Sequence, residues 1–155
     1  MKKRAILLGV AAVLAMGVVC FAADDMYVGT WKLNEAKSKL PAGATKNNTV
    51  IYEAAGDSVK VTVDGVTADG KAVHDEWTGK FDGKDYPLTG DPTADSRSYK
   101  KIDDHTMALA NKKDGKVVAS GRIVISADSK SRTLHLIGTD AAGKKDTSSA
   151  VYDKQ

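Results

Sequence analysis

The chain contains a single cysteine, three histidines and three prolines in 155 residues. The cysteine, Cys20, lies in an apolar N-terminal segment, so the rest of the chain has no thiol for a disulfide, a cysteine-ligated metal or nucleophilic catalysis. A domain of this length can bury a sufficient core without disulfides. We therefore expect one domain held together by its apolar core.

Residues 1–22 have the features of a secretion signal. Three basic residues at 2–4 precede the uncharged segment 5–22, and Cys20 and Ala22 place small residues at the −3 and −1 positions of a cleavage site. Two aspartates follow at 24–25. We predict cleavage after Ala22, a mature domain of residues 23–155, and a periplasmic or secreted protein with no stable membrane insertion.

Two alternatives remain for this segment. Its apolar run is long enough to serve as an uncleaved membrane anchor, because about 20 residues span a bilayer. Cys20 could instead carry a lipid, but that modification usually requires a small residue before the cysteine, and Val19 stands there.

The mature chain also lacks an excess of charge. The formal charge of +3 arises from 23 basic and 20 acidic residues, and the three basic residues at 2–4 leave with the signal. The remaining charges balance, so net charge gives no support for nucleic acid or an anionic membrane as a partner.

Short alternating segments separated by turn residues dominate the rest of the sequence. The clearest alternation places Val59, Val61 and Val63 on one face of a strand that Gly65 interrupts, as a β-bulge would. Asp-Gly pairs mark several hairpins. We expect strands at 27–33, 48–55, 59–64, 71–82, 86–88, 97–102, around 107–109, 116–126, around 134–136 and 150–152.

The segment 34–45 has room for one helical turn at most, and we find no amphipathic helix of ten residues. Consecutive strands joined by short turns pair antiparallel, and closure removes the exposed edges of a large open sheet. The predicted fold is all-β, an antiparallel up-and-down β-barrel of about 8–10 strands. A two-sheet sandwich is the alternative.

The segment 28–33, VGTWKL, resembles the first strand of the calycins, which include lipocalins and fatty-acid-binding proteins and share a Gly-x-Trp near the mature N-terminus. More closely, GTWKLNEAKSK and the later DGKDYPLTGDP are similar to exported bacterial lipocalin-like proteins. The resemblance implies that Trp31 plugs the closed end of a barrel, with a basic residue, Arg132 or Lys154, packed over its ring.

The sequence departs from fatty-acid-binding proteins in two places. Their C-terminal Arg-x-Tyr is missing, because Ala150 stands two residues before Tyr152. The segment 34–46 is also too short for their two-helix lid.

Ligand pockets combine apolar walls with a few polar groups. Five residues of the predicted strands could supply both and are our candidates for ligand binding: Tyr52, Asp75, Trp77, Tyr86 and Tyr99. Asp75 is the carboxylate of the inward face of strand 71–82. A buried carboxylate needs a partner, either a barrel group or a ligand. The aromatic residues would equally fill a solid barrel. The weakly patterned strand 97–102 is the candidate portal.

We identify no catalytic residues, metal site or cofactor. His74, Asp75 and Glu76 are consecutive, and neighbours on a strand point to opposite faces, so they cannot share one ion. His105 and His135 are expected to be exposed. Asp75 as a buried acid or base is the enzymatic alternative.

The sequence therefore predicts an exported, monomeric, lipocalin-like protein that binds a small apolar or amphipathic molecule without covalent chemistry. The rival is a pocketless barrel that acts through its outer surface as an envelope interaction or assembly protein.

Overall fold

The computed structural model describes residues 26–139 and 143–155. The predicted signal segment lies outside these residues. The described residues form ten strands and one 3₁₀ turn. The elements are β1 (Gly29–Leu33), η1 (Glu35–Lys37), β2 (Lys46–Ala55), β3 (Ser58–Val66), β4 (Ala72–Gly79), β5 (Tyr86–Thr89), β6 (Ser96–Lys101), β7 (Thr106–Lys113), β8 (Lys116–Ile125), β9 (Ser131–Thr139) and β10 (Lys145–Lys154).

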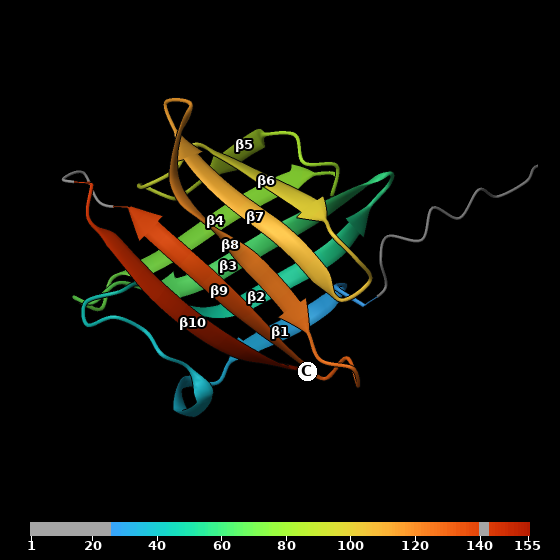
Figure 1. Ribbon diagram of the computed structural model, residues 1–155, viewed down its shortest axis with the longest axis horizontal. Coiled ribbons are helices and arrows are strands. Elements are labelled where there is room, and N and C mark those ends of the chain that lie inside the picture. The colour runs from blue at the N-terminus through green and yellow to red at the C-terminus, as the bar shows by residue number, and fades with distance from the viewer. Residues whose placement is uncertain (1–25, 140–142) are drawn as a thin grey trace, which may run out of the picture.

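Every strand pairs antiparallel with its neighbours in sequence, and β1 closes the sheet by pairing with β10 (Figure 1). The predicted up-and-down β-barrel is confirmed, and the two-sheet alternative is wrong. The β1–β10 register places Trp31 opposite Lys154 and Leu33 opposite Tyr152. Closure leaves neither β1 nor β10 with a free edge. The removal of such edges was the argument for predicting a barrel and not an open sheet.

The barrel has two different ends (Figure 1). The closed end contains the start of β1 and the turn between β8 and β9. Trp31 is fully buried there. At the other end, which we call the open end, lie the turns after β3 and β7 and the segment 38–45 between η1 and β2. The site described below is at the open end.

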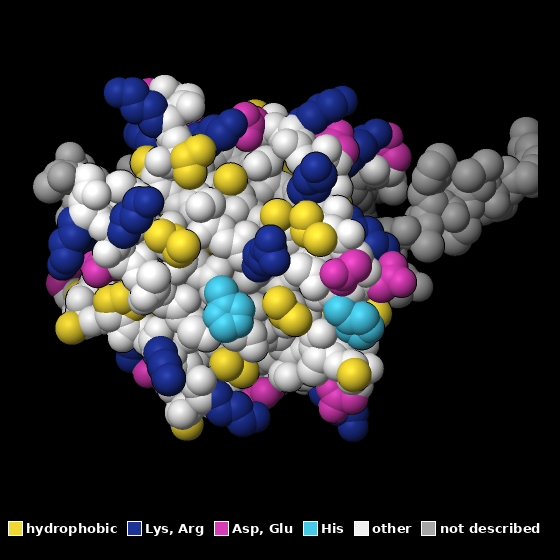
Figure 2. Space-filling view, viewed as in Figure 1, with side chains coloured by type: hydrophobic (Ala, Val, Ile, Leu, Met, Phe, Trp, Pro, Cys, Tyr) yellow, Lys and Arg dark blue, Asp and Glu magenta, His cyan; other side chains and the backbone are white. Residues whose placement is uncertain are grey.

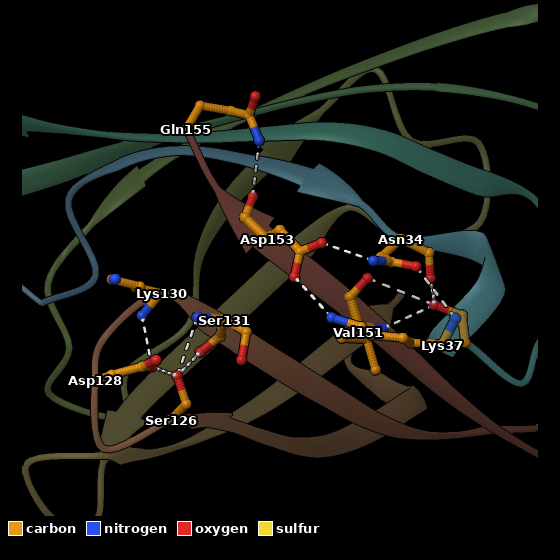
Figure 3. A network of polar contacts seen from close by, with 10 residues as sticks. Asn34, Lys37, Ser126, Asp128, Lys130, Ser131, Val151, Asp153 and Gln155 are labelled. Carbon is orange, nitrogen blue, oxygen red and sulfur yellow. Dashed lines mark hydrogen bonds and ion pairs between the residues drawn. The ribbon is translucent and has the colours of Figure 1, made fainter.

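The 3₁₀ turn η1 is fixed to β10 by polar contacts (Figure 3). The Asn34 side chain caps the turn by accepting from the Lys37 backbone N–H and donates to Asp153 at 2.7 Å. The Ser38 hydroxyl donates to the Asn34 carbonyl and accepts from the Val151 N–H. This network holds the start of segment 38–45 against the barrel wall.

Two irregularities change which side chains face inward. A bulge opposes Gly65, but it lies in β2 between Asn47 and Thr49 rather than in β3. A Cβ at Gly65 would lie 2.4 Å from the Lys46 carbonyl oxygen, so glycine is required where the bulged strand approaches. A second irregularity in the β7–β8 pairing leaves Val117 exposed, although the alternation predicted it inward, and Val118 packs on the core instead.

The strand predicted to border a portal, β6, is completely paired on one side only. Arg97 and Tyr99 of β6 are buried, and β6 pairs with β7 along its whole length. The narrow part of the sheet is β5, which makes two register pairs with each neighbour.

Candidate functional site

The closed half of the barrel is filled by aromatic rings around Trp31. The indole N–H donates to the Tyr27 carbonyl at 2.9 Å. Both basic residues that the calycin resemblance proposed lie over the ring: the Arg132 Cζ is 5.2 Å and the Lys154 Nζ 5.1 Å from its centroid. Cations over an aromatic face are stabilised by the negative potential of the ring.

Arg132 also faces two tyrosine rings. Its Cζ lies 4.9 Å from the ring centroid of Tyr52 and 4.7 Å from that of Tyr152, and one terminal nitrogen donates to the Tyr52 hydroxyl at 2.8 Å. The side chain is buried, yet among the described residues no carboxylate pairs with it, and its Nε has no hydrogen-bond partner. An uncompensated buried cation is costly unless aromatic faces or a bound anion stabilise it.

A second aromatic group packs around Trp77. Its indole N–H donates to the Arg97 carbonyl at 2.8 Å. The ring meets Tyr99 and Tyr86 edge to face, with centroids 4.8 and 5.7 Å away. Gly79 makes this packing feasible, because a Cβ there would lie 2.5 Å from the Tyr86 ring and 2.6 Å from that of Trp77. This half of the barrel is solid.

Asp75 and Arg97 form a buried ion pair above these rings. The Arg97 guanidinium lies 3.3 Å from the Asp75 carboxylate, and both side chains are almost completely buried. Burial raises the pKa of Asp75 above its usual range, and the positive charge of Arg97 opposes that rise. Asp75 faces inward as expected, and its partner is a barrel group.

The remaining donors of Arg97 reach further polar groups. Its Nε donates to the Asn111 side-chain oxygen at 2.8 Å, and a terminal nitrogen lies 4.0 Å from Asp91. The two strands that carry Arg97 and Asn111 place them directly opposite each other. The inward face near the open end therefore carries a fixed cluster of hydrogen-bonding groups.

A cavity of about 60 Å³ lies next to this cluster. Its polar lining comes from Arg97, Asn111, Asn47 and Arg132, and apolar side chains complete it. The volume holds only a few non-hydrogen atoms, because drug-sized ligands usually occupy roughly 300–1,000 Å³.

A larger hollow of about 320 Å³ lies at the open end, between the segment Leu40–Thr45 and strands β9 and β10. Its barrel side consists of Leu136, Gly138, Asp146 and Ser148. Leu136 lines both this hollow and the inner cavity. The segment that η1 fixes to β10 forms the other wall.

The structure thus separates the five residues predicted for ligand binding. Tyr99 lines the inner cavity. Tyr52, Trp77 and Tyr86 belong to the aromatic packing, and Asp75 is held by Arg97. The residues that line the cavity but were not singled out include Asn47, Asn111 and Leu136. For Leu136, the sequence held a usable signal, because Leu134 and Leu136 alternate on the inward face of their strand.

The histidines give no metal site. His74 contacts Asp64 at 2.7 Å on the outside of the barrel, while Asp75 points inward. Among residues 26–139 and 143–155, no three potential ligands from histidine, cysteine, aspartate and glutamate come together. Within the same residues, no helix has the length and apolar character needed to cross a membrane.

No protein-family model matches the chain, and no curated protein matches it either. Solved structures with a similar barrel include EF1p2_mFAP2b bound to DFHBI, with 11% identity, 86% of this chain and 97% of that chain covered, and a TM-score of 0.49. The redesigned β-barrel mFAP1 bound to DFHBI gives 15% identity, coverages of 85% and 98%, and a TM-score of 0.45.

Lobster apocrustacyanin A1 is a third similar structure, with 14% identity, coverages of 84% of this chain and 62% of that chain, and a TM-score of 0.39. At these identities and scores, no ligand or activity can be transferred to this chain. The functional argument therefore comes from the geometry of its own open end.

Proposed function

We propose that this protein is an exported, lipocalin-like barrel that binds a slender amphipathic molecule at its open end, without chemical conversion. The apolar part of the ligand would lie in the hollow between Leu40–Thr45 and Leu136. Its polar end would enter the inner cavity beside Arg97 and Asn111. Together the two spaces provide the volume that the inner cavity alone lacks.

One observation supports this proposal most strongly. Arg132 lines the inner cavity, is buried, and has a free Nε with no carboxylate partner in the described part of the chain. A ligand carboxylate or other acceptor would satisfy that donor and compensate the buried charge. Arg97 differs, since Asp75 already neutralises it. The polar end of the ligand is therefore proposed to be an acceptor, most simply a carboxylate.

Native mass spectrometry of the mature protein, isolated from the envelope fraction of its own organism, tests the proposal. We expect an adduct of a few hundred daltons. Gly138→Trp should abolish it, because a Cβ at Gly138 meets no atom within 4 Å and the indole would fill the hollow. Ala55→Trp adds the same ring at the exposed last residue of β2, at the other end of the barrel, and should retain the adduct.

The rival function, a barrel that acts through its surface, is favoured by the solid packing of the closed half and by the small inner cavity. The same experiment separates the two. A clean apo mass, also after incubation with a panel of fatty acids and aromatic carboxylates, would overturn ligand binding at the open end. An adduct that survives in Gly138→Trp would place the ligand elsewhere.

A further inference from the structure

A wide hollow lies outside the barrel, over strands β7 to β10. We call it the outer groove; it has a volume of about 820 Å³. Its floor is formed by Ala108, Ser120, Val124 and Ile137, whose side chains point away from the barrel interior. Val124 and Ile137 are among the exposed large apolar residues. The proposed ligand site at the open end does not require this groove.

The outer groove is lined partly by small side chains, among them Ala108, Ser120, Thr147 and Ser149. Cross-strand pairing aligns Ala108 with Arg122 and Ala110 with Ser120. Beneath the outer face, Gly121 belongs to the inward-facing row of β8, and a Cβ there would lie 1.9 Å from the His135 carbonyl oxygen. The two backbones therefore approach closely, with little side-chain bulk above them.

One row of the groove carries basic side chains. Arg122 of β8 lies directly opposite His135 of β9, which in turn lies opposite Ser149 of β10. Lys39 extends the row by an isolated bridge to Ser149, and opposed residues of an antiparallel pair point to the same face. Lys39, Arg122 and His135 thus form a row across the groove, between Ser120 and Val124 on the outer face of β8.

These basic groups are not neutralised. Among the described residues, none of the three forms an ion pair or a side-chain hydrogen bond, and no aspartate or glutamate lines the groove. Figure 2 shows the corresponding face, with no acidic side chain across its middle. The outer face of β3 and β4 is different, because Lys60 pairs with Glu76 at 2.6 Å there.

From this geometry we infer that the outer groove is a second binding site, specific for amphipathic organic anions with an aromatic or short aliphatic body. The apolar body would cover Ile137 on one side of the basic row, and Val124 borders the same row on its other side. The anionic head would be held by Arg122, with Lys39 and His135 beside it. The hydroxyl groups of Ser120 and Ser149 supply further hydrogen-bond donors at the edge of the same hollow.

Fluorescence titration with a matched pair of probes tests the inference. 8-Anilinonaphthalene-1-sulfonate carries the anion, and N-phenyl-1-naphthylamine has the same rings without it. We expect the sulfonate to bind the folded protein more tightly than the neutral probe. Arg122→Gln should weaken sulfonate binding roughly tenfold, as expected for loss of one charge-assisted contact, and should leave the neutral probe unaffected.

Two controls locate the binding. Lys60→Gln removes the same charge from the opposite outer face and should leave sulfonate affinity unchanged. Gly138→Trp blocks the open end and should also leave it unchanged. In amide NMR spectra, the sulfonate should shift Ser120, Val124 and Ile137.

Three results would overturn the inference: no binding of the sulfonate by the folded protein, equal affinity of the Arg122→Gln variant, or loss of binding in Gly138→Trp. Arg122 is exposed, so its substitution should not unfold the protein. A circular dichroism spectrum matching that of the wild type checks this point.

Discussion

The guanidinium of Arg132, on β9, lies over the indole ring of Trp31, on β1, 5.2 Å from its centroid, with only β10 between the two strands in the barrel wall. The same side chain faces Tyr52 and Tyr152. One cation therefore holds together rings from three strands, β1, β2 and β10, on either side of the barrel seam.

We expect Arg132→Ala to lower the free energy of unfolding by about 3 kcal/mol, since three rings lose their cation and a cavity remains. Arg132→Lys should cost about half as much, because an ammonium group cannot cover three rings as a planar guanidinium does. Urea unfolding followed by tryptophan fluorescence measures both. A loss below about 1 kcal/mol for Arg132→Ala would show that the stack contributes little.

The buried pair of Asp75 and Arg97 predicts an unusual pH dependence. The pKa of Asp75 is raised by burial above 3.8, its value in the unfolded chain, so the folded state holds the proton more tightly. The stabilisation that comes from this tighter proton binding is complete below about pH 3.8. It is lost as the pH rises through the raised pKa of Asp75 in the folded protein. A simple salt bridge would behave in the opposite way.

The Asp75→Asn variant isolates this effect, because the other carboxylates remain in both proteins. Relative to the wild type, the variant should become more stable as the pH rises from about 3 to about 7, by about 1.4 kcal/mol for each tenfold difference in acidity between the folded and unfolded carboxyl. Urea unfolding across this pH range provides the comparison. If the Asp75→Asn variant instead becomes less stable relative to the wild type as the pH rises, the net effect of Arg97 is to lower the pKa of Asp75 below its usual value.

Gly79 is predicted to be intolerant of any side chain. A methyl group there would collide with the rings of Trp77 and Tyr86, so Gly79→Ala should lower stability by about 1–3 kcal/mol. Gly138→Ala serves as the matched control, since its added methyl group meets open space, and its effect should stay within about 0.5 kcal/mol. Thermal unfolding distinguishes them; equal melting temperatures would contradict the packing described.

Gly121→Ala should be more damaging than Gly79→Ala, by at least about 1 kcal/mol. The added methyl group would meet the carbonyl of His135, which belongs to the backbone and cannot turn aside as a ring can. Hydrogen exchange should show faster exchange of β8 and β9 amides in this variant. Protection equal to that of the wild type would contradict this prediction. It would mean that β8 and β9 can move apart enough to admit the methyl group while keeping their hydrogen bonds.

Much of the barrel could be predicted because its strands and turns are marked by residues within short segments of the sequence. The alternation of Val59, Val61 and Val63 and the Asp-Gly turns define strands without reference to distant residues. The role of Trp31 followed from the calycin resemblance, and both candidate cations were found over its ring. Val117 and the bulge opposite Gly65 were not placed correctly, since an irregularity between paired strands is a property of the pair and not of either sequence.

The site was harder to predict for the same reason. Asp75 was expected to need a partner, but its partner on another strand follows from the register, and the sequence could not choose Arg97. The cavity depends on what several side chains leave unfilled, so aromatic content near Tyr52 and Trp77 indicated packing as readily as binding. The outer groove arises from alignment across four strands, which no single segment reveals.

The pairing of β1 with β10 has a consequence for how the chain acquires its structure. The side-chain contact between Asn34 and Asp153 joins residues 119 positions apart, so the seam can form only after nearly all of the domain has been synthesised. Until then β1 presents unsatisfied amides to any neighbouring chain, and pairings of such long range form slowly. The interval before the seam forms is therefore when this protein is most exposed to misassembly, and a folding factor that covers a strand edge would act then.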